Sequence, residues 1–328
     1  MRDNLHSAAG GLGVIEEAAA RLRAGGLVVF PTETVYGLGA DALNPRAVAR
    51  VFDVKQRPRF DPLIVHIADI GWLHDLVTAF PPDARRLADR FWPGPLTFVL
   101  PRTDRIPDLV TAGLPSVAVR MPRHPLAMDL IRRVGGPVAA PSANRFGRLS
   151  PSTADDARAE VGEGVDMILD GGPCPVGIES TIVSFAGEQP ILLRPGGLPI
   201  EDIESILGPL ASAGHADERP QSPGRLLRHY APRTPLELVA LPPPPAARAH
   251  AGLLAPFPLP DTGGFARVEI LSATGDPAEA AARLFRALRE LDGAGLEKLF
   301  AIRGPEQGLW RAIHDRLQRA SITPETPP

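Results

Sequence analysis

The sequence predicts an α/β protein with a large unit over residues 1–207 and a small unit over residues 236–328. Short apolar runs of four or five residues alternate with longer segments of helical periodicity. Residues 208–224 are small, polar and rich in proline and glycine, which is typical of a linker. The chain has 328 residues, 44% of them apolar, which fits one large or two medium domains with ample cores.

The composition argues against several classes of protein. No apolar run reaches the roughly 18 residues that a transmembrane helix needs, so we expect no membrane partner. Residues 1–10 lack the charged and then apolar order of a signal peptide. The single cysteine, Cys174, excludes an intrachain disulfide and a cysteine-based zinc cage. We therefore expect a cytoplasmic protein, and its net charge of −3 gives no general attraction to nucleic acid.

The first helix and strand lead into a polar segment. Residues 14–24 have the periodicity of a helix that a pair of glycines ends, and the apolar residues 27–30 predict a buried strand. The segment 31–39 follows at once and contains two threonines, a glutamate, a tyrosine and two glycines. Because α/β proteins place binding groups in loops at strand ends, we predict a functional role for Thr34. The alternative is that it satisfies the backbone of a turn.

A cationic loop follows the second helix, which we expect over residues 44–53. Lys55, Arg57 and Arg59 place three cations within five residues, and a strand that ends near His66 comes next. Two prolines restrict the loop, so we expect it to hold these cations at the mouth of the strand. Such a layout suits a polyanion, for example a nucleotide triphosphate. Lys55 is one of only two lysines in the chain, which indicates a position where a guanidinium does not fit.

Polar or cationic residues also follow later strands. We predict these strands over residues 96–100, 117–121, 137–140, 167–170, 177–185 and 191–194. Arg120 ends an apolar run, where an arginine usually binds an anion or pairs with a carboxylate. Ser142 and Asn144 follow the next strand on one side of an extended chain, and Arg194 ends the last strand. Together with Thr34, these side chains predict a ligand cleft at one edge of a sheet.

Helices are predicted between these strands. They cover residues 69–92 with a break at 81–82, residues 125–133, a helix capped by residues 150–153, and residues 200–207. Arginines are frequent between residues 120 and 148. This segment is either a basic wall that binds a polyanion or, in part, an ordinary solvated helix face.

The linker ends in a cationic and aromatic cluster, residues 225–232, which is a candidate clamp over the ligand. The small unit follows. Its predicted strands lie near 236–240, 252–255, 268–271 and 298–302, and its helices near 276–291 and 306–319. The unit contains no recognisable chemical motif, so we interpret it as regulatory or structural.

Together, these segments resemble the YrdC-like threonylcarbamoyl-AMP synthases, in the long form that has an extra C-terminal domain. The matching segments are PTETVYGLG at 31–39, KQRPRFDPLIVHI at 55–67, FWPGPLT at 91–97, VAVRMPRHP at 117–125, APSANRFGRLSPST at 140–153, GIESTIV at 177–183, LRPGG at 193–197 and SPGRLLRHYAP at 222–232. They occur in order, and AARLFRALRELDGAG at 281–295 and LWRAIHDRLQRA at 309–320 resemble the second domain of the long form, so the match covers nearly the whole chain. The resemblance implies a large YrdC-like domain with a twisted mixed sheet and a concave cationic cleft. It also implies a linker over residues 208–235 that covers the active site and a small Rossmann-like C-terminal α/β domain.

The resemblance implies a reaction in which L-threonine, bicarbonate and ATP give threonylcarbamoyl-adenylate, pyrophosphate and water. The product feeds the modification of the adenosine beside the anticodon of tRNA. We therefore expect hand-over to a downstream tRNA threonylcarbamoyl transferase, and a weak contact with tRNA is an open possibility. Mg²⁺ is expected with ATP, held by phosphates and water rather than by a protein metal site.

The family's site residues are carried over position by position. The resemblance implies catalytic roles for Lys55 and Arg57. The implied ATP-binding residues are Lys55, Arg57, Asp61, Ser116, Ser142, Asn144, Ser150, Arg194, His229 and Tyr230. The implied threonine-binding residues are Thr34, His66, Arg120, Ala140 and Ser180, with Arg120 binding the carboxylate.

The chain departs from the family pattern at a few positions. Asp61 stands where the family usually has asparagine, and a carboxylate near phosphates repels them unless a cation pairs with it. Ser116 replaces a common threonine, and Arg225 and Leu226 differ from the usual linker residues. Two other functions remain open: an RNA-binding module without catalysis, and a related carbamoyl-handling enzyme. The single cysteine and the absence of room for additional domains argue against the second.

Overall fold

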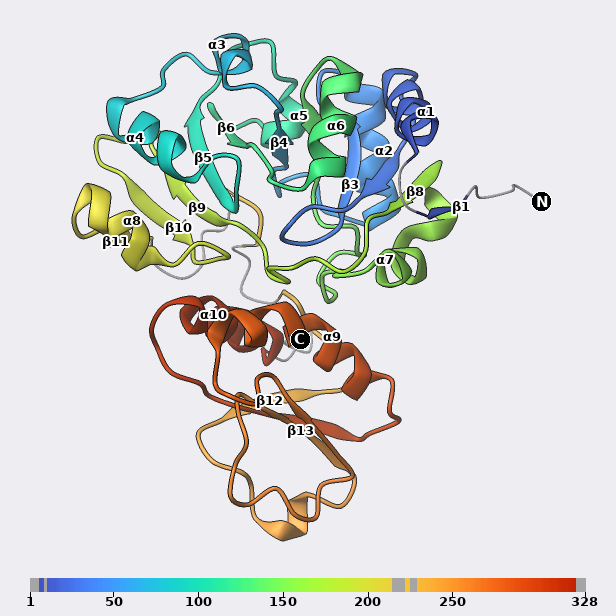
Figure 1. The fold of residues 1–328 in the computed structure, drawn as a ribbon, viewed down its shortest axis with the longest axis vertical. Coiled ribbons are helices and arrows are strands. Elements are labelled where there is room, and N and C mark those ends of the chain that lie inside the picture. The colour runs from blue at the N-terminus through green and yellow to red at the C-terminus, as the bar shows by residue number, and fades with distance from the viewer. Residues whose placement is uncertain (1–5, 9–10, 214–221, 225–228, 323–328) are drawn as a thin grey trace, which may run out of the picture.

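The computed structural model describes residues 6–8, 11–213, 222–224 and 229–322. Figure 1 shows a large body, formed by the first two thirds of the chain, and a small body below it. Among the described residues, eleven strands form one mixed sheet in the large body, and four parallel strands form a second sheet in the small body. This arrangement confirms the predicted α/β class. None of the helices described is long and apolar enough to cross a membrane.

The sheet of the large body has the strand order β1-β8-β2-β3-β7-β4-β6-β5-β9-β10-β11. Its strands are β1 (His6–Ala8), β2 (Val28–Phe30), β3 (Gly37–Asp41), β4 (Ile64–His66), β5 (Leu96–Pro101), β6 (Ser116–Arg120), β7 (Val138–Ala139), β8 (Met167–Asp170), β9 (Thr181–Ser184), β10 (Ile191–Arg194) and β11 (Ala211–Ser212). The helices are α1 (Leu12–Arg23), α2 (Pro45–Lys55), α3 (Leu73–Leu76), α4 (Pro82–Phe91), α5 (Asp108–Thr111), α6 (Pro125–Val134), α7 (Ala154–Val161) and α8 (Ile200–Leu207), with short 3₁₀ turns η1 (Ile70–Trp72) and η2 (Gly162–Gly164). Helix α1 packs on α6, α2 on β3 and α4 on α8.

Most predicted elements are present, and the differences have local causes. The predicted break at 81–82 is present, since α4 begins at Pro82, but only the short η1 and α3 form in the stretch before it. Helix α2 continues to Lys55, so this lysine belongs to a helix and not to the loop after it. The prediction missed β3, which lies in a segment that we expected to be a loop, and β11, which lies in the predicted linker. Strand β1 and helix α5 are too short to give a periodic signal.

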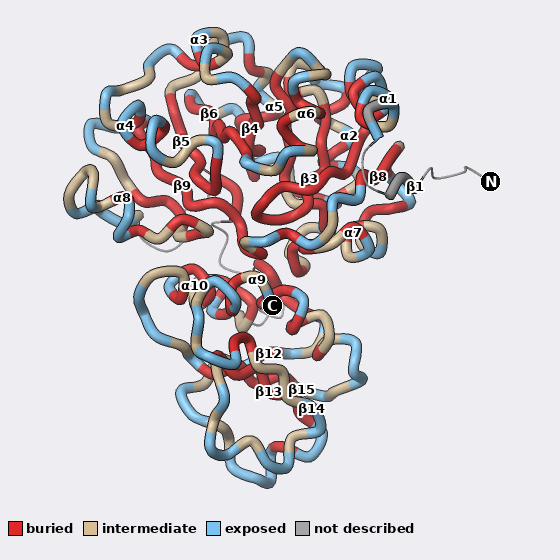
Figure 2. The backbone as a smooth tube through the Cα atoms, in the orientation of Figure 1, coloured by how far each residue is buried: buried red, intermediate tan, exposed pale blue. Residues whose placement is uncertain are grey.

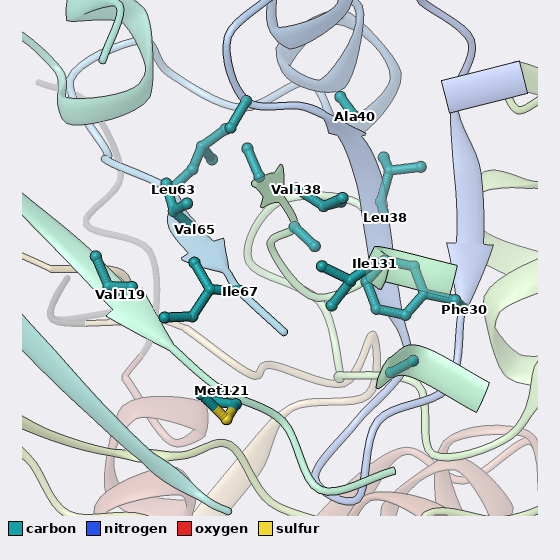
Figure 3. Close-up of a cluster of buried hydrophobic side chains, with 14 of the residues drawn as sticks. Phe30, Leu38, Ala40, Leu63, Val65, Ile67, Val119, Met121, Ile131 and Val138 are labelled. Carbon is teal, nitrogen blue, oxygen red and sulfur yellow. The ribbon is translucent and has the colours of Figure 1, made fainter. Parts of the chain in front are cut away.

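The centre of the large sheet is apolar. Strands β2 and β4 are buried at every residue, which explains why they appear in the sequence as uninterrupted apolar runs. Figure 3 shows side chains from β2, β3, β4, β6, β7 and α6 gathered in one cluster, among them Phe30, Val65 and Ile131. In Figure 2 the buried backbone runs through these strands to their ends. This packing holds fixed the polar residues that end the strands.

The register of the sheet brings several polar residues together. Strand β4 pairs with β6 so that His66 lies opposite Arg120, and β5 pairs with β6 so that Thr97 also lies opposite Arg120. Strand β9 runs parallel to β5, and Ser180 directly precedes it. An isolated bridge joins Ser142 to the first residue of β3. Residues from five distant parts of the chain therefore meet at one place in the sheet.

The small body is an α/β layer with the strand order β12-β15-β13-β14. Its elements are β12 (Leu236–Val239), η3 (Pro245–Ala247), β13 (Ala251–Ala255), β14 (Arg267–Ile270), α9 (Pro277–Asp292), β15 (Lys298–Ile302) and α10 (Leu309–Ala320). The apolar face of α9, with Leu284, Phe285 and Leu288, is fully buried. Both helices lie on the side of this sheet that faces the large body (Figure 1).

Close backbone contact fixes how α9 meets the large body. Gly177 has φ of +73°, and a Cβ there would lie 2.5 Å from the Cα of Ala282 in α9. On the same helix, Arg289 donates to the carbonyl of Leu149 at 2.6 Å and pairs with Glu160 at 3.3 Å. Only glycine satisfies both the positive φ and the short distance at position 177.

Replacing Gly177 with alanine should therefore weaken the docking of the two bodies. The side chain costs roughly 1–2 kcal/mol through its left-handed backbone alone, and the clash with α9 adds to that cost. We expect a lower unfolding midpoint and faster proteolytic cleavage between the bodies. The matched control is Gly172→Ala, because Gly172 has φ of +80° but no heavy atom within 4 Å of its added Cβ. Equal losses in the two variants would contradict the packing role of Gly177.

Candidate active site

A cavity lies where the strand ends meet the linker. Its walls are Thr32, Thr34, Val35, Gly37, Arg57, Ile64, His66, Arg120, Ala140, Pro141, Ser142, Glu179, Ser180, Arg194, Pro223, Gly224, His229 and Tyr230. The structure thus brings together Arg57, Ser142, Arg194, His229 and Tyr230 from the predicted ATP-binding set. It also brings all five predicted threonine-binding residues to the same cavity: Thr34, His66, Arg120, Ala140 and Ser180.

Arg120 is held on three sides. Its Nε donates to the carbonyl of Gly94 at 3.1 Å, and Nη1 donates to the hydroxyl of Thr34 at 2.9 Å. Nη2 lies 2.8 Å from Oε1 of the buried Glu33. Nη1 has a second N–H, and Nη2 makes no hydrogen bond among the described residues, so both terminal nitrogens have an N–H for another partner. This fork is suited to a carboxylate, which accepts two parallel hydrogen bonds from arginine.

His66 and Ser180 line the wall beside Arg120, and Thr97, which does not line the cavity, holds the hydroxyl of Ser180. Burial, and then the charge of Arg120, lower the pKa of His66 to about 3, so the imidazole is neutral at ordinary pH. Its Nδ1 is buried and has no hydrogen-bond partner among the described residues. The hydroxyls of Thr97 and Ser180 share a hydrogen bond of 2.7 Å. This wall therefore offers neutral donors and acceptors next to a cation.

Arg57 forms a second cationic wall. Its Nε donates to the carbonyl of Asp61 at 3.0 Å, and Nη2 donates to the carbonyl of Pro62 at 2.8 Å. Nη2 also lies 2.8 Å from Oδ2 of Asp61, and both side chains are buried. Asp61 does not line the cavity. The carboxylate that departs from the family pattern is therefore paired with Arg57 rather than exposed to a ligand.

Lys55 supports the cavity from behind. Its ammonium donates to the carbonyls of Ser142 and Asn144, both at 2.5 Å, and the side chain is fully buried at the end of α2. Asn144 in turn donates to the carbonyls of Arg145 and Arg148. The prediction that a loop holds three cations at the mouth of a strand is therefore wrong for Lys55. Arg59 is exposed and does not line the cavity. A compact ammonium between two carbonyls is a position that a guanidinium would not fit.

Arg194 joins the sheet to the linker. Its Nη2 donates to the carbonyl of Ser180 at 2.9 Å, and Nη1 donates to the carbonyl of Pro223 in the linker at 3.0 Å. Gly224, with φ of +77°, lies so close that an added Cβ would be 2.5 Å from the hydroxyl of Tyr230 and 2.8 Å from Nη1 of Arg194. Pro223, Gly224, His229 and Tyr230 of the linker therefore form a wall of the cavity. Arg225 and Leu226 lie outside the described residues.

His229 and Tyr230 close the cavity on the linker side. Their rings are 4.1 Å apart, and Tyr230 has a positive φ of +59°. Burial, and then the charge of Arg57, lower the pKa of His229 well below its ordinary value. The hydroxyl of Tyr230 and Nδ1 of His229 are buried without hydrogen-bond partners among the described residues. Unsatisfied polar atoms of this kind need an explanation, and a ligand in the cavity supplies one.

Five residues of the predicted ATP-binding set lie outside the cavity lining, namely Lys55, Asp61, Ser116, Asn144 and Ser150. Ser116 begins β6, at the opposite end of that strand from Arg120. Ser150 is buried and donates its hydroxyl to Glu179, which does line the cavity.

The sequence analysis missed Glu33, Thr97, Glu179 and Arg316. Glu33 and Glu179 lie inside the segments quoted for the family resemblance, but only pairing geometry indicates their roles. Arg316, in α10 of the small body, gave no signal.

The arginines of residues 120–148 do not form a continuous basic wall. Arg120 is buried against Glu33. Arg133 pairs with Asp129 at 3.0 Å and with Glu16 at 3.4 Å. The interpretation as a solvated helix face therefore holds for Arg133, and Arg120 belongs to the cavity.

Among the described residues, no group of three or more histidine, cysteine, aspartate or glutamate side chains is placed to hold a metal ion. Glu179, the one carboxylate among the described side chains of the cavity wall, lies 3.0 Å from Arg316. Protein carboxylates therefore offer little to a cation at this site.

Comparisons with known proteins give a consistent result. A family model named for Sua5, YciO and YrdC, described as telomere recombination, matches residues 20–196. A second model, described as the C-terminal domain of threonylcarbamoyl-AMP synthase, matches residues 198–321. The threonylcarbamoyl-AMP synthase of Pyrococcus abyssi is 41% identical over 318 residues and covers 94% of both chains. That of Bacillus subtilis is 42% identical over 323 residues, covering 94% of this chain and 92% of the relative. The structure of P. abyssi Sua5 complexed with L-threonine has a TM-score of 0.88 at 38% identity and covers 96% of each chain.

The buried state of His66 predicts a specific pH response. In the unfolded chain a histidine has a pKa near 6.5, whereas the folded value is about 3. Between these values only the unfolded state binds the proton, so this group destabilises the fold progressively as pH falls below about 6.5. We expect the imidazole shifts of His66 in NMR spectra, assigned with His66→Gln, to stay constant from pH 5 to pH 8. A titration midpoint near 6.5 would contradict the neutral, buried state.

Proposed function

The chain belongs to the threonylcarbamoyl-AMP synthase family, in the form with a C-terminal domain, and on that premise we propose that it makes threonylcarbamoyl-AMP from L-threonine, bicarbonate and ATP. One observation carries the proposal. The fixed fork of Arg120 opens into the same cavity as Arg57 and Arg194. A cavity of this kind suits a small amino acid carboxylate on one side and a polyphosphate on the other.

We assign the threonine site to Arg120 and its neighbours. Arg120 binds the carboxylate with its two remaining N–H groups, and Thr34 fixes the orientation of the guanidinium. His66, Ser180 and Ala140 line the space next to it. A neutral His66 does not compete with Arg120 for the carboxylate, and its unpartnered Nδ1 is available to threonine's polar groups. A relative crystallised with L-threonine supports the choice of amino acid.

We assign the nucleotide to the side of Arg57, Arg194 and the linker. Arg57 and Arg194 face the phosphates, and Ser142, His229 and Tyr230 complete the wall. Lys55 and Asn144 hold the loop that carries Ser142. Ser150 acts through Glu179, and Asp61 acts by orienting Arg57. Ser116 as an ATP contact stays a prediction from the family pattern alone.

The proposed reaction needs positioning and charge neutralisation more than a nucleophilic side chain. The amine of threonine attacks bicarbonate, and a carbamate forms with loss of water; attack on CO₂ gives the same carbamate with release of a proton. A carbamate oxygen then attacks the α-phosphorus of ATP, the bond to the β-phosphate oxygen breaks, and pyrophosphate leaves. Arg57 and Arg194 neutralise charge on the phosphates, and Lys55 keeps the loop that carries Ser142 in position.

Several further assignments follow from the same premise. Mg²⁺ enters with ATP, held by phosphate oxygens and water, since Glu179 is already paired with Arg316. The product is handed to the transferase that modifies tRNA, which makes the cytoplasm the expected location. Residues 1–207 form the catalytic domain, residues 208–235 the linker that covers the site, and residues 236–328 the C-terminal domain.

Pyrophosphate release tests the proposed reaction directly. The purified chain is incubated with ATP, Mg²⁺ and bicarbonate, with and without L-threonine, and L-serine is the control amino acid. We expect release that depends on threonine, together with threonylcarbamoyl-AMP in the mass spectrum. Absence of release from a protein that binds ATP would reject the proposed reaction, and RNA binding that weakens with salt would then favour the non-catalytic alternative.

Replacing Arg120 with lysine tests the carboxylate site. Lysine keeps the charge opposite Glu33 but removes the bidentate fork, so we expect the KM for threonine to rise by about 10-fold or more. The KM for ATP should change by less than about threefold, because the fork lies on the threonine side. Arg123→Met is the matched control, since Arg123 is exposed and outside the cavity. An unchanged KM for threonine in Arg120→Lys would contradict the assignment.

A further inference from the structure

One arginine of the small body reaches the wall of the cavity. Arg316, on α10, is fully buried. Its Nε donates to Oε2 of Glu179 at 3.0 Å, and its Nη1 donates to the carbonyl of Pro195 at 2.5 Å. Nη1 also donates to Asp315, its neighbour on the helix, at 3.0 Å. Because Glu179 and Pro195 belong to the large body, this side chain crosses the boundary between the two bodies.

Glu179 makes this contact functionally important. It is the one acidic residue among the described side chains that line the cavity. Burial opposes its ionisation, but the charges of Arg316 and Arg194 together lower the pKa of Glu179, so it is a carboxylate at neutral pH. An uncompensated carboxylate in this wall would repel a polyphosphate.

Arg316 also supports the linker. Its guanidinium carbon lies 5.3 Å from the centre of the Tyr230 ring. Tyr230 has a positive φ and packs against Phe285 of α9, with ring centres 5.7 Å apart. A residue keeps a strained backbone conformation only while the contacts around it hold it there. Arg316 therefore contacts two walls of the cavity, one formed by the sheet and one by the linker.

We propose that Arg316 is a positioning residue of the nucleotide site, an inference that rests on the proposed function. It compensates the charge of Glu179 and holds Tyr230, so that the phosphate side of the cavity is complete only when the small body is docked. The threonine side does not depend on it, because Arg120 has its own buried partner, Glu33.

The test compares Arg316→Met, Glu179→Gln and the double variant R316M/E179Q. Arg311→Met is the matched control, because Arg311 also lies on α10 but is exposed and 3.8 Å from Glu201, outside the cavity. For each variant, binding of a non-hydrolysable ATP analogue is measured by calorimetry. The KM values for ATP and threonine are measured by pyrophosphate release.

We expect R316M to weaken analogue binding and to raise the KM for ATP by about 10-fold or more, because it leaves Glu179 as an unpaired charge. The KM for threonine should stay within about threefold. The double variant should bind the analogue with a Kd within about threefold of that of E179Q, because the charges of Arg316 and Glu179 are then both absent. R311M should behave as the parent chain. Equal increases in both KM values, or a double variant no better than R316M, would show that Arg316 only docks the two bodies.

Two further comparisons keep the test decisive. If R316M fails to fold, Arg316→Lys and R316M/E179Q replace it, since neither leaves Glu179 uncompensated. Both should bind the analogue with a Kd within about fivefold of that of the parent chain. A large increase of the Kd in both variants would overturn the proposal. A parent chain that binds the analogue but releases no pyrophosphate with threonine would reject the proposed reaction and leave the comparison of variants intact. A parent chain that does not bind the analogue would reject both.

Discussion

A buried guanidinium needs a carboxylate or backbone carbonyls as partners, and this requirement organises the cavity. Moving one such ion out of water costs several kcal/mol, so an arginine without such partners would not remain in these walls. Three pairs surround the cavity: Arg57 with Asp61 at 2.8 Å, Arg120 with Glu33 at 2.8 Å and Arg316 with Glu179 at 3.0 Å. Each carboxylate fixes one edge of a guanidinium, and each guanidinium also donates to a backbone carbonyl or a hydroxyl. The pairs therefore determine the directions of the hydrogen bonds that a ligand meets.

Because these pairs are neutral overall, they do not by themselves make the cavity attractive to a polyanion. Lys55 and Arg194 supply the excess positive charge. Both are buried, and both donate to backbone carbonyls, with no carboxylate within ion-pair distance among the described residues. Burial, and then the charge of Arg57, lower the pKa of Lys55, so the folded protein already holds this charge at a cost. Arg194 lines the cavity whereas Lys55 lies behind it, so the unpaired positive charge at the cavity surface comes from Arg194.

Much of this arrangement could be predicted from the sequence, and the rest depends on contacts between distant residues. The fold class and the strands that carry Arg120 and Arg194 follow from apolar runs, because a central strand buried on both faces has no polar alternation. The residues at the ends of those strands were identifiable for the same reason. The partners of the charged residues were not identifiable, because Glu33, Glu179 and Arg316 have ordinary local surroundings in the sequence. Lys55 was noticed for its rarity, but its role as a bridge between two carbonyls appears only in the folded chain.

The small body shows why a domain without a chemical motif still affects chemistry. Gly177 allows α9 to approach the large body at backbone distance, and Arg316 of α10 then reaches Glu179. Tyr230 of the linker lines the cavity, and the guanidinium carbon of Arg316 lies 5.3 Å from the centre of its ring. Separating the bodies would leave Glu179 without its main cation and Tyr230 without the aromatic contact to α9. The charge balance of the cavity is therefore coupled to the docking of the small body, and neither can be changed without the other.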